Sequence, residues 1–230
     1  MEIIDDFLDE EYFLRLFKLF NEELPWYLST IVSCDIKSPI AGYESSNKNK
    51  QMSHIFVNHK AKSIWLNELD KLFNKLNAKN IYRAKANLIF NTNKKTVGGW
   101  HYDNQVDKDI KIAILYFDNN NGYTLLEDGT KVKSKKNRVL KFNDDVLHTS
   151  VAQTDKDTRI VLNMRNTELS KEFFGFIDEG LNSYIQKYNL HTMFSEGLWC
   201  RDFLVQRSIA DMCEQYSTWH CEASSRETSD

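Results

Sequence analysis

Three residues of types that bind transition metals lie in the middle of the chain. His101 and Asp103 are two residues apart in the segment Gly98-Gly-Trp-His-Tyr-Asp-Asn104, and His148 follows later. Residues i and i+2 of a strand point to the same face, so we expect His101 and Asp103 to project together. Two imidazoles and one carboxylate on one face of an ion leave three coordination positions open for other ligands. The sequence therefore predicts a metal site at these three residues, which would also be the catalytic ones.

A His-x-Asp pair alone is a weak signal, because two solvated polar residues at a strand end would look the same. The stronger signal is Arg159, which opens the apolar run Arg159-Ile-Val-Leu-Asn-Met164 shortly after His148. A buried charge without a partner is costly, and a guanidinium matches a carboxylate with paired hydrogen bonds. We expect Arg159 to bind a carboxylate ligand; the alternative is a surface arginine at the start of a strand.

The secondary structure that must position these residues is predicted to change from helices to strands along the chain. Apolar residues at helical spacing predict a helix between Asp5 and Leu24, capped by Asp9, and a second from about Ala61 to Leu76. Short β-rich runs separated by turn signals then follow. The runs are Tyr82–Phe90, Ile110–Phe117, Tyr123–Leu126, Lys131–Val132, Arg138–Phe142, Thr149–Val151 and Arg159–Met164. This pattern predicts a mainly β fold with flanking helices, a sandwich or jelly roll, on whose sheet the N-terminal helices pack.

The bulk properties exclude some classes of protein. The chain has 230 residues, enough for one domain and an extension, and a net charge of -3 that lacks a basic nucleic-acid footprint. A local basic patch would still be compatible with that total, so nucleic acid is not favoured but not excluded. The start resembles no signal peptide, and no apolar run has the length of a membrane span. With four widely spaced cysteines, we expect free thiols and a cytoplasmic protein.

A family resemblance rests on motifs in residues 80–166, whose order and spacing match. They are His101-x-Asp103, Ile112-Ala-Ile-Leu-Tyr-Phe-Asp118, Asn121-Gly-Tyr-Thr124, Glu127-Asp-Gly-Thr130, Asn137-Arg-Val-Leu-Lys-Phe142, His148 and Arg159. In these the chain resembles the 2-oxoglutarate/Fe(II)-dependent dioxygenases, particularly the prolyl-4-hydroxylase-like branch of marine bacteria and phages. The resemblance implies a double-stranded β-helix, that is, a jelly roll with the metal at one mouth.

The resemblance also implies a cofactor set and further binding residues. Fe(II) would be the metal, 2-oxoglutarate and O2 the cosubstrates, and ascorbate a candidate reductant. Arg159 and Tyr116 would bind the distal carboxylate of 2-oxoglutarate, although Tyr116 could equally be a core residue. Thr124 matches a small polar residue that follows the family's glycine turn.

Two asparagines complete the implied cosubstrate site. Asn163 shares a strand face with Arg159, and Asn87 stands where relatives use a polar or aromatic contact. The chain departs from the family at Val161, where many relatives have serine or threonine. This change removes one expected hydrogen bond.

The resemblance implies hydroxylation of a C–H bond, with release of succinate and CO2. A peptide side chain such as proline, or a small molecule, is the favoured substrate. One alternative is an AlkB-type nucleic-acid demethylase, because Arg159 and Arg165 have the spacing of that family. Another is a catalytically dead, cupin-like binding module. The sequence identifies neither the substrate nor the oligomeric state.

The C-terminal part contains a second copy of one motif. Trp219-His-Cys-Glu222 repeats the Trp-His-x-acid pattern of Trp100-His-Tyr-Asp103, but no histidine or arginine follows it at the distances of His148 and Arg159 from the first copy. We expect residues 1–168 to form the dioxygenase domain. Residues 169–230 would be a helical extension, either a plain tail or the truncated start of a second dioxygenase-like domain.

Overall fold

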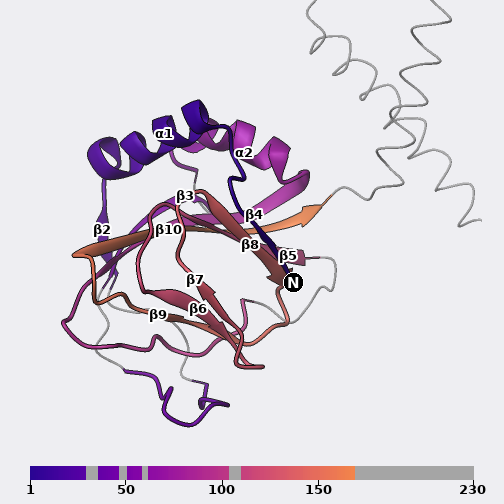
Figure 1. Cartoon of the computed structure of the whole chain (residues 1–230). Coiled ribbons are helices and arrows are strands. Elements are labelled where there is room, and N and C mark those ends of the chain that lie inside the picture. The colour runs from indigo at the N-terminus through magenta and orange to yellow at the C-terminus, as the bar shows by residue number, and fades with distance from the viewer. Residues whose placement is uncertain (30–35, 47–50, 59–61, 104–109, 169–230) are drawn as a thin grey trace, which may run out of the picture. The chain divides into compact units, whose positions relative to one another are not determined.

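The computed structural model describes residues 1–29, 36–46, 51–58, 62–103 and 110–168 (Figure 1). These residues belong to one unit, Met1–Glu168. The expectations for residues 169–230, including the second Trp-His-x-acid motif, lie outside the described residues. No helix in the described part is long and apolar enough to cross a membrane.

Two antiparallel sheets form the body of this unit, one with the strand order β1-β8-β5-β10-β4-β3-β2 and the other with the order β7-β6-β9. The strands are β1 (Glu2–Ile4), β2 (Tyr27–Ser29), β3 (Gln51–Val57), β4 (Ala78–Phe90), β5 (Ile110–Tyr116), β6 (Tyr123–Leu126), β7 (Lys131–Lys133), β8 (Arg138–Asn143), β9 (His148–Val151) and β10 (Thr158–Glu168). Isolated bridges from Val97 to Val151 and from His101 to His148 extend the smaller sheet beyond β9. The chain therefore passes repeatedly between the sheets, as in a jelly roll, and the predicted fold class is confirmed.

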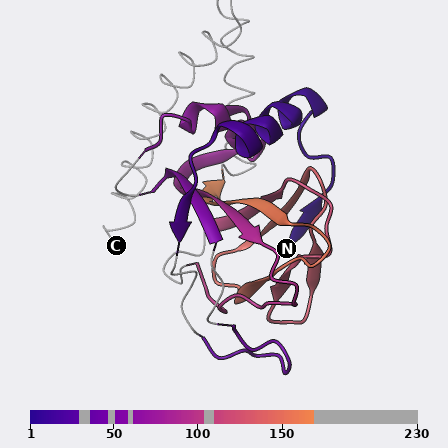
Figure 2. The ribbon, with the colours of Figure 1, turned by 90° about the vertical axis from the view of Figure 1, so that its left-hand side faces the viewer.

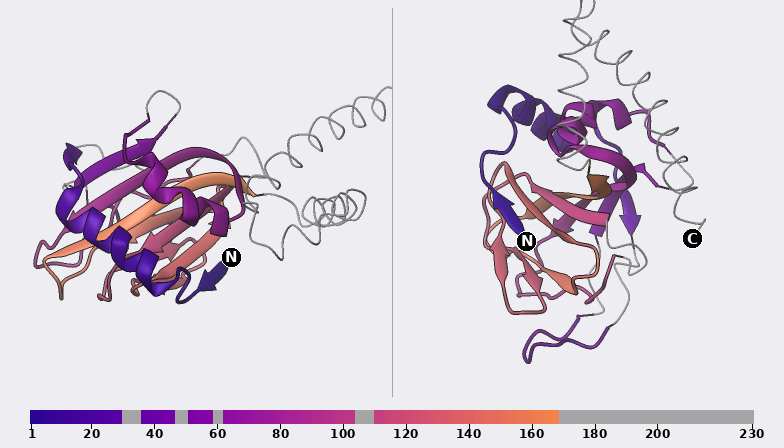
Figure 3. Two further views of the ribbon diagram at one scale, coloured as in Figure 1. Left: turned by 90° about the horizontal axis from the view of Figure 1, so that it is seen from above. Right: turned by 90° about the vertical axis from the view of Figure 1, so that its right-hand side faces the viewer.

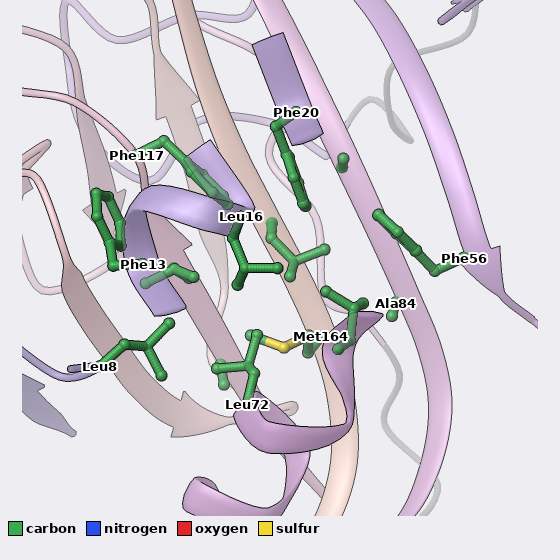
Figure 4. Packing of buried hydrophobic residues seen from close by; sticks show 14 of the residues in the cluster. Leu8, Phe13, Leu16, Phe20, Phe56, Leu72, Ala84, Phe117 and Met164 are labelled. Atoms are coloured by element: carbon green, nitrogen blue, oxygen red, sulfur yellow. The ribbon is translucent and has the colours of Figure 1, made fainter. Parts of the chain in front are cut away.

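The helices cover one face of the larger sheet, and the smaller sheet lies on its other side (Figures 1 and 2). They are α1 (Glu10–Lys18), a π-helical turn (Leu19–Glu23), a 3-10 turn (Leu66–Leu69) and α2 (Asp70–Lys75). Seen from above, α1 and α2 lie over the strands (Figure 3). Phe13, Leu16 and Phe20 pack onto Phe117 and the sheet, all of them buried (Figure 4). Each such side chain contributes roughly 1.5–3 kcal/mol through burial.

The first helix begins later than its apolar spacing alone would allow. Asp9 caps it as predicted, because its Oδ1 accepts a hydrogen bond of 2.9 Å from the amide of Tyr12. Residues before Asp9 are bound to the turn that precedes β8. The side chain of Asn137 accepts from the Leu8 amide at 2.9 Å and donates to the Leu8 carbonyl at 2.8 Å. This pairing fixes the N-terminal segment against the sheet and outside the helix.

The second helix was predicted too long. Its regular part begins only at Leu66, and Ile64, expected on its apolar face, is 90% exposed. Ser63 explains the difference, because its amide donates to the Phe56 carbonyl at 2.8 Å and its hydroxyl contacts His54 Nε2 at 3.0 Å. These contacts bind the segment to β3 in place of a first helical turn.

Candidate metal centre and cosubstrate pocket

His101 and His148 are held side by side by backbone pairing. They exchange hydrogen bonds of 3.0 and 3.1 Å between their amides and carbonyls, and their ring centroids are 4.4 Å apart. The expectation of a continuous strand through His101 and Asp103 was wrong. His101 has only this isolated bridge, and Asp103 lies in a bend. The bend, rather than strand alternation, brings the Asp103 carboxylate to the two imidazoles.

Both imidazoles are oriented by backbone carbonyl groups. Nδ1 of His101 lies 2.9 Å from the carbonyl oxygen of Gly99, and Nδ1 of His148 lies 2.9 Å from that of Val146. A carbonyl oxygen only accepts hydrogen bonds, so each Nδ1 carries the hydrogen. Each Nε2 then presents its lone pair, which is the form of histidine that binds a metal.

Asp103 completes the cluster with a nearly buried carboxylate. Its Oδ1 accepts a hydrogen bond from Arg83 Nη2. Its Oδ2 lies 3.7 Å from Nε2 of His148. Neither of these two buried atoms has a hydrogen-bond partner among the described residues, which is costly unless a cation lies between them. One ligand atom from each of His101, Asp103 and His148 lies within 4.8 Å of the others, so this donor set fits a divalent transition metal.

The electrostatics of the cluster favour metal binding. Burial, assisted by the neighbouring His101, lowers the pKa of His148 to about 4. Burial alone would raise the pKa of Asp103, but Arg83 and the two histidines outweigh it, and the pKa of this carboxyl is lowered. At neutral pH His148 is therefore neutral and Asp103 is ionised. These are the protonation states that a metal requires of its ligands.

A cavity of about 280 Å³ adjoins the three residues and is lined by both sheets. Its size is at the lower end of the range for small-molecule sites, roughly 300–1,000 Å³. The smaller sheet and its extension contribute Thr124, Thr149 and Ser150 together with the three candidate ligands, which we call the metal cluster. The larger sheet contributes side chains from β4 and β10. The cavity therefore suits a small cosubstrate and one small reacting group.

Arg159 lines this cavity and is 1% exposed. Its Nη1 donates to the hydroxyl of Ser150 and to the carbonyl oxygen of Val151, both at 3.1 Å. Its Nε has no partner among the residues that the structure describes. Burial lowers the pKa of this guanidinium, and Tyr116 and Asp118 only partly offset the effect. A buried, incompletely bonded guanidinium of this kind fits a carboxylate.

The four other predicted cosubstrate residues are placed differently from one another. Thr124, Asn87 and Asn163 line the cavity. Tyr116 is fully buried behind Thr124, to whose hydroxyl its own hydroxyl is hydrogen-bonded at 2.7 Å, and it is not among the lining residues. Its ring lies 5.6 Å from the guanidinium carbon of Arg159. Tyr116 is thus placed to support Thr124 and Arg159 from the core side.

Sequence reasoning missed several lining residues, above all Arg83, Lys85, Gln51 and Ser150. Arg83 contacts both Asp103 and Asn163 Oδ1, the latter at 3.3 Å. A signal was present in the sequence, since Arg83 and Lys85 precede Asn87 at the two-residue spacing of one strand face. Likewise, Ser150 follows His148 by two residues on β9.

The six-residue spacing of Arg159 and Arg165 has a structural explanation. Arg165 is buried, does not line the cavity, and forms an ion pair with Asp144 at 3.2 Å. It is thereby committed to the connection between β8 and β9. The spacing that suggested a nucleic-acid demethylase therefore places no second guanidinium in the cavity.

Comparison with known proteins gives the fold a context. No protein-family model and no curated protein sequence matches the chain. An oxidoreductase of the 2OG-Fe(II) oxygenase family from Burkholderia pseudomallei matches at a TM-score of 0.51 and 12% identity, over 72% of this chain and 84% of that one. This similarity establishes a shared fold.

Two prolyl hydroxylases are also structurally similar. The prolyl-4-hydroxylase of Pseudomonas putida matches with a TM-score of 0.44 and 14% identity, over 73% of this chain and 92% of that chain. The second is a prolyl hydroxylase from Trichoplax adhaerens in complex with a peptide fragment of the hypoxia inducible factor oxygen degradation domain. It matches with a TM-score of 0.46 and 10% identity, over 73% of this chain and 83% of that chain.

Proposed function

We propose that the protein is a 2-oxoglutarate- and Fe(II)-dependent dioxygenase that hydroxylates a C–H bond. The observation that carries this proposal is the set of three donors, His101, Asp103 and His148, beside a buried guanidinium with an unsatisfied Nε. A metal and a carboxylate are the two ligands that this pair of features requires. Prolyl or other peptide side chains and small molecules are the substrate classes that fit the small cavity.

The overall reaction would be balanced by the cosubstrates. One oxygen atom of O2 enters succinate and the other enters the hydroxyl group, while 2-oxoglutarate loses CO2. When bound here, Fe(II) together with 2-oxoglutarate supplies O2 activation for attack on the C–H bond. The ligands would be His101, Asp103 and His148, and ascorbate would keep the metal reduced.

The protein's own residues position the reactants. Arg159 would hold the distal carboxylate of 2-oxoglutarate, with Ser150 and the Val151 carbonyl fixing its guanidinium. The carbonyl groups of Gly99 and Val146 hold the two imidazoles by Nδ1, so that their Nε2 atoms would be available to the metal. Placing the reactants in this way lowers the entropic part of the barrier.

The proposal is tested by metal binding and by cosubstrate turnover. Purified protein with Fe(II), ascorbate, O2 and 2-oxoglutarate should form succinate, slowly without a substrate. Asp103→Ala should lose both Fe(II) binding and succinate formation. Asp145→Ala is the control, since Asp145 is an exposed acid that precedes the ligand His148 in the sequence. Unchanged succinate formation by Asp103→Ala would refute the proposed site.

A further inference from the structure

The inner face of β4 carries an unusual pair of cations. Arg83 and Lys85 face the cavity, whereas the alternating residues Ala84 and Ala86 are fully buried in the core beneath the helices. A cation in a half-buried cavity is unfavourable unless something offsets its charge. Arg83 is offset by Asp103. The charge of Lys85 needs an offsetting partner of its own.

Lys85 forms no hydrogen bond or ion pair with any residue that the structure describes. Burial lowers the pKa of its ammonium, and Arg83 adds to this, while Asp103 acts in the opposite direction. The neighbouring cavity residues Asn87 and Asn163 are neutral amides. The free ammonium is therefore available to a ligand in the cavity.

Strand register places Lys85 on the opposite side of the metal cluster from Arg159. Lys85 pairs with Asn163, whereas Arg159 pairs with Ile89, four residues further along β4. Four residues of strand span about 13 Å. Ser150, which follows His148 on β9, contacts Arg159, while Asp103 contacts Arg83 at the other end. The metal cluster thus lies between Arg159 and the Arg83–Lys85 pair.

The charges of the cavity remain unbalanced when cofactors are added. Apart from the histidines, its charged lining residues within the described part of the chain are Arg83, Lys85, Arg159 and Asp103. The distal carboxylate of 2-oxoglutarate would offset Arg159, and its other carboxylate together with Asp103 would offset the two charges of Fe(II). The charges of Arg83 and Lys85 would then remain, so the surplus lies on the Lys85 side.

We infer that the substrate carries a carboxylate, which binds Lys85 on the side of the metal cluster away from Arg159. This inference rests on the proposed function and specifies its substrate class. Arg83 is already hydrogen-bonded to Asp103 and Asn163, so Lys85 is the specificity-determining residue. The carboxylate could be that of a free amino acid or an acidic side chain of a peptide.

Two sets of probes distinguish these sources. One set contains the free L-amino acids and their carboxamides. The other contains N-acetylated, C-amidated peptides with Asp or Glu, and the same peptides with Asn or Gln. Substrate-stimulated succinate formation and a +16 Da product would be measured for each. We expect acids in one set to stimulate turnover and their uncharged counterparts to fail.

The variants Lys85→Gln, Lys85→Glu and Lys85→Arg test the residue itself. Lys85→Gln should raise KM for the stimulating acid by about 10-fold or more, Lys85→Glu should abolish stimulation, and Lys85→Arg should retain most of it. KM for 2-oxoglutarate should stay unchanged in all three. Lys79→Gln, at an exposed position of the same strand, should behave as wild type.

A binding measurement adds a readout that is independent of turnover. Calorimetric titration of the stimulating acid into protein loaded with Mn(II) and 2-oxoglutarate, without O2, should show the same loss of affinity in Lys85→Gln. Equal stimulation by acids and amides, no stimulation by any acid, or a raised KM for 2-oxoglutarate in Lys85→Gln would overturn the inference. Uncoupled succinate formation by wild type would then still support the dioxygenase, whereas its absence together with absent Fe(II) binding would reject the proposed function.

Discussion

Replacing Arg159 by methionine isolates the predicted role of the buried guanidinium. Methionine keeps much of the apolar volume of the side chain but removes the charge and all five donors. In wild type, Nη1 is hydrogen-bonded to Ser150 and Val151, and Nε is free for a ligand. The variant should therefore lose the carboxylate of 2-oxoglutarate without losing a metal ligand.

The magnitude follows from the bonds that remain for a ligand. A carboxylate can accept two hydrogen bonds from one edge of a guanidinium. Hydrogen bonds to charged groups contribute about 1.5–3 kcal/mol each, so the loss of two weakens binding by roughly 3–6 kcal/mol, on the order of 10²- to 10⁴-fold in Kd.

The assay is equilibrium binding of 2-oxoglutarate to Mn(II)-loaded protein without O2, with Mn(II) affinity measured separately. Arg165→Met is the matched control, since Arg165 is a buried arginine on the same strand that pairs with Asp144 outside the cavity. Breaking that pair should destabilise the fold by about 3–5 kcal/mol and leave 2-oxoglutarate affinity unchanged.

Two results would refute the reasoning. A change in Kd of less than about 10-fold in Arg159→Met would show that the guanidinium does not bind the cosubstrate. A parallel loss of Mn(II) affinity would show that Arg159 acts on the metal cluster instead.

Three further predictions concern the support of the site and fold. In Gly122→Ala, the new Cβ would lie 2.8 Å from Asn120 Oδ1, 3.0 Å from the Gln153 backbone nitrogen and 3.1 Å from Arg159 Cδ. The turn and Arg159 must therefore shift, and KM for 2-oxoglutarate should rise on the order of 10-fold in steady-state assays. Asn137→Ala should cost about 2–4 kcal/mol in urea unfolding, because two hydrogen bonds to Leu8 and a positive φ of 58° are no longer supported. Asn137→Gly should cost less, since glycine tolerates that φ; an equal cost would contradict the backbone argument. For the chelator-treated protein, the free energy of unfolding should fall as pH falls from 6.5 towards 4, because the pKa of His148 is lowered to about 4 in the fold. The stabilisation from neutral His148 is fully present above pH 6.5, and about 3 kcal/mol of the free energy of unfolding is lost by pH 4. A His148→Gln variant that keeps the same pH dependence would show that His148 is not its cause.

Most of the β framework could be predicted from the sequence because it is encoded locally. Alternating apolar residues and turn signals such as Glu127-Asp-Gly129 mark strand ends, and β6 has the predicted bounds, Tyr123–Leu126. Gly129 has a φ of +87°, which its residue type anticipates. The helices were less predictable, because contacts outside the helix decide where they begin, such as that of Leu8 with Asn137, which is distant in sequence, and that of Ser63 with β3.

The sequence by itself determined which residues could bind a metal and a carboxylate, since residue type and order suffice for that. Only the tertiary structure decided how they meet. A bend aligns Asp103 with the histidines, where strand alternation was expected, and Tyr116 lies behind Thr124, outside the cavity lining. The part played by Arg83 and Lys85 also depends on register, because only the pairing of β4 with β10 places them across the metal cluster from Arg159. Register and burial are set by the packing of the whole sheet, and no local pattern encodes them.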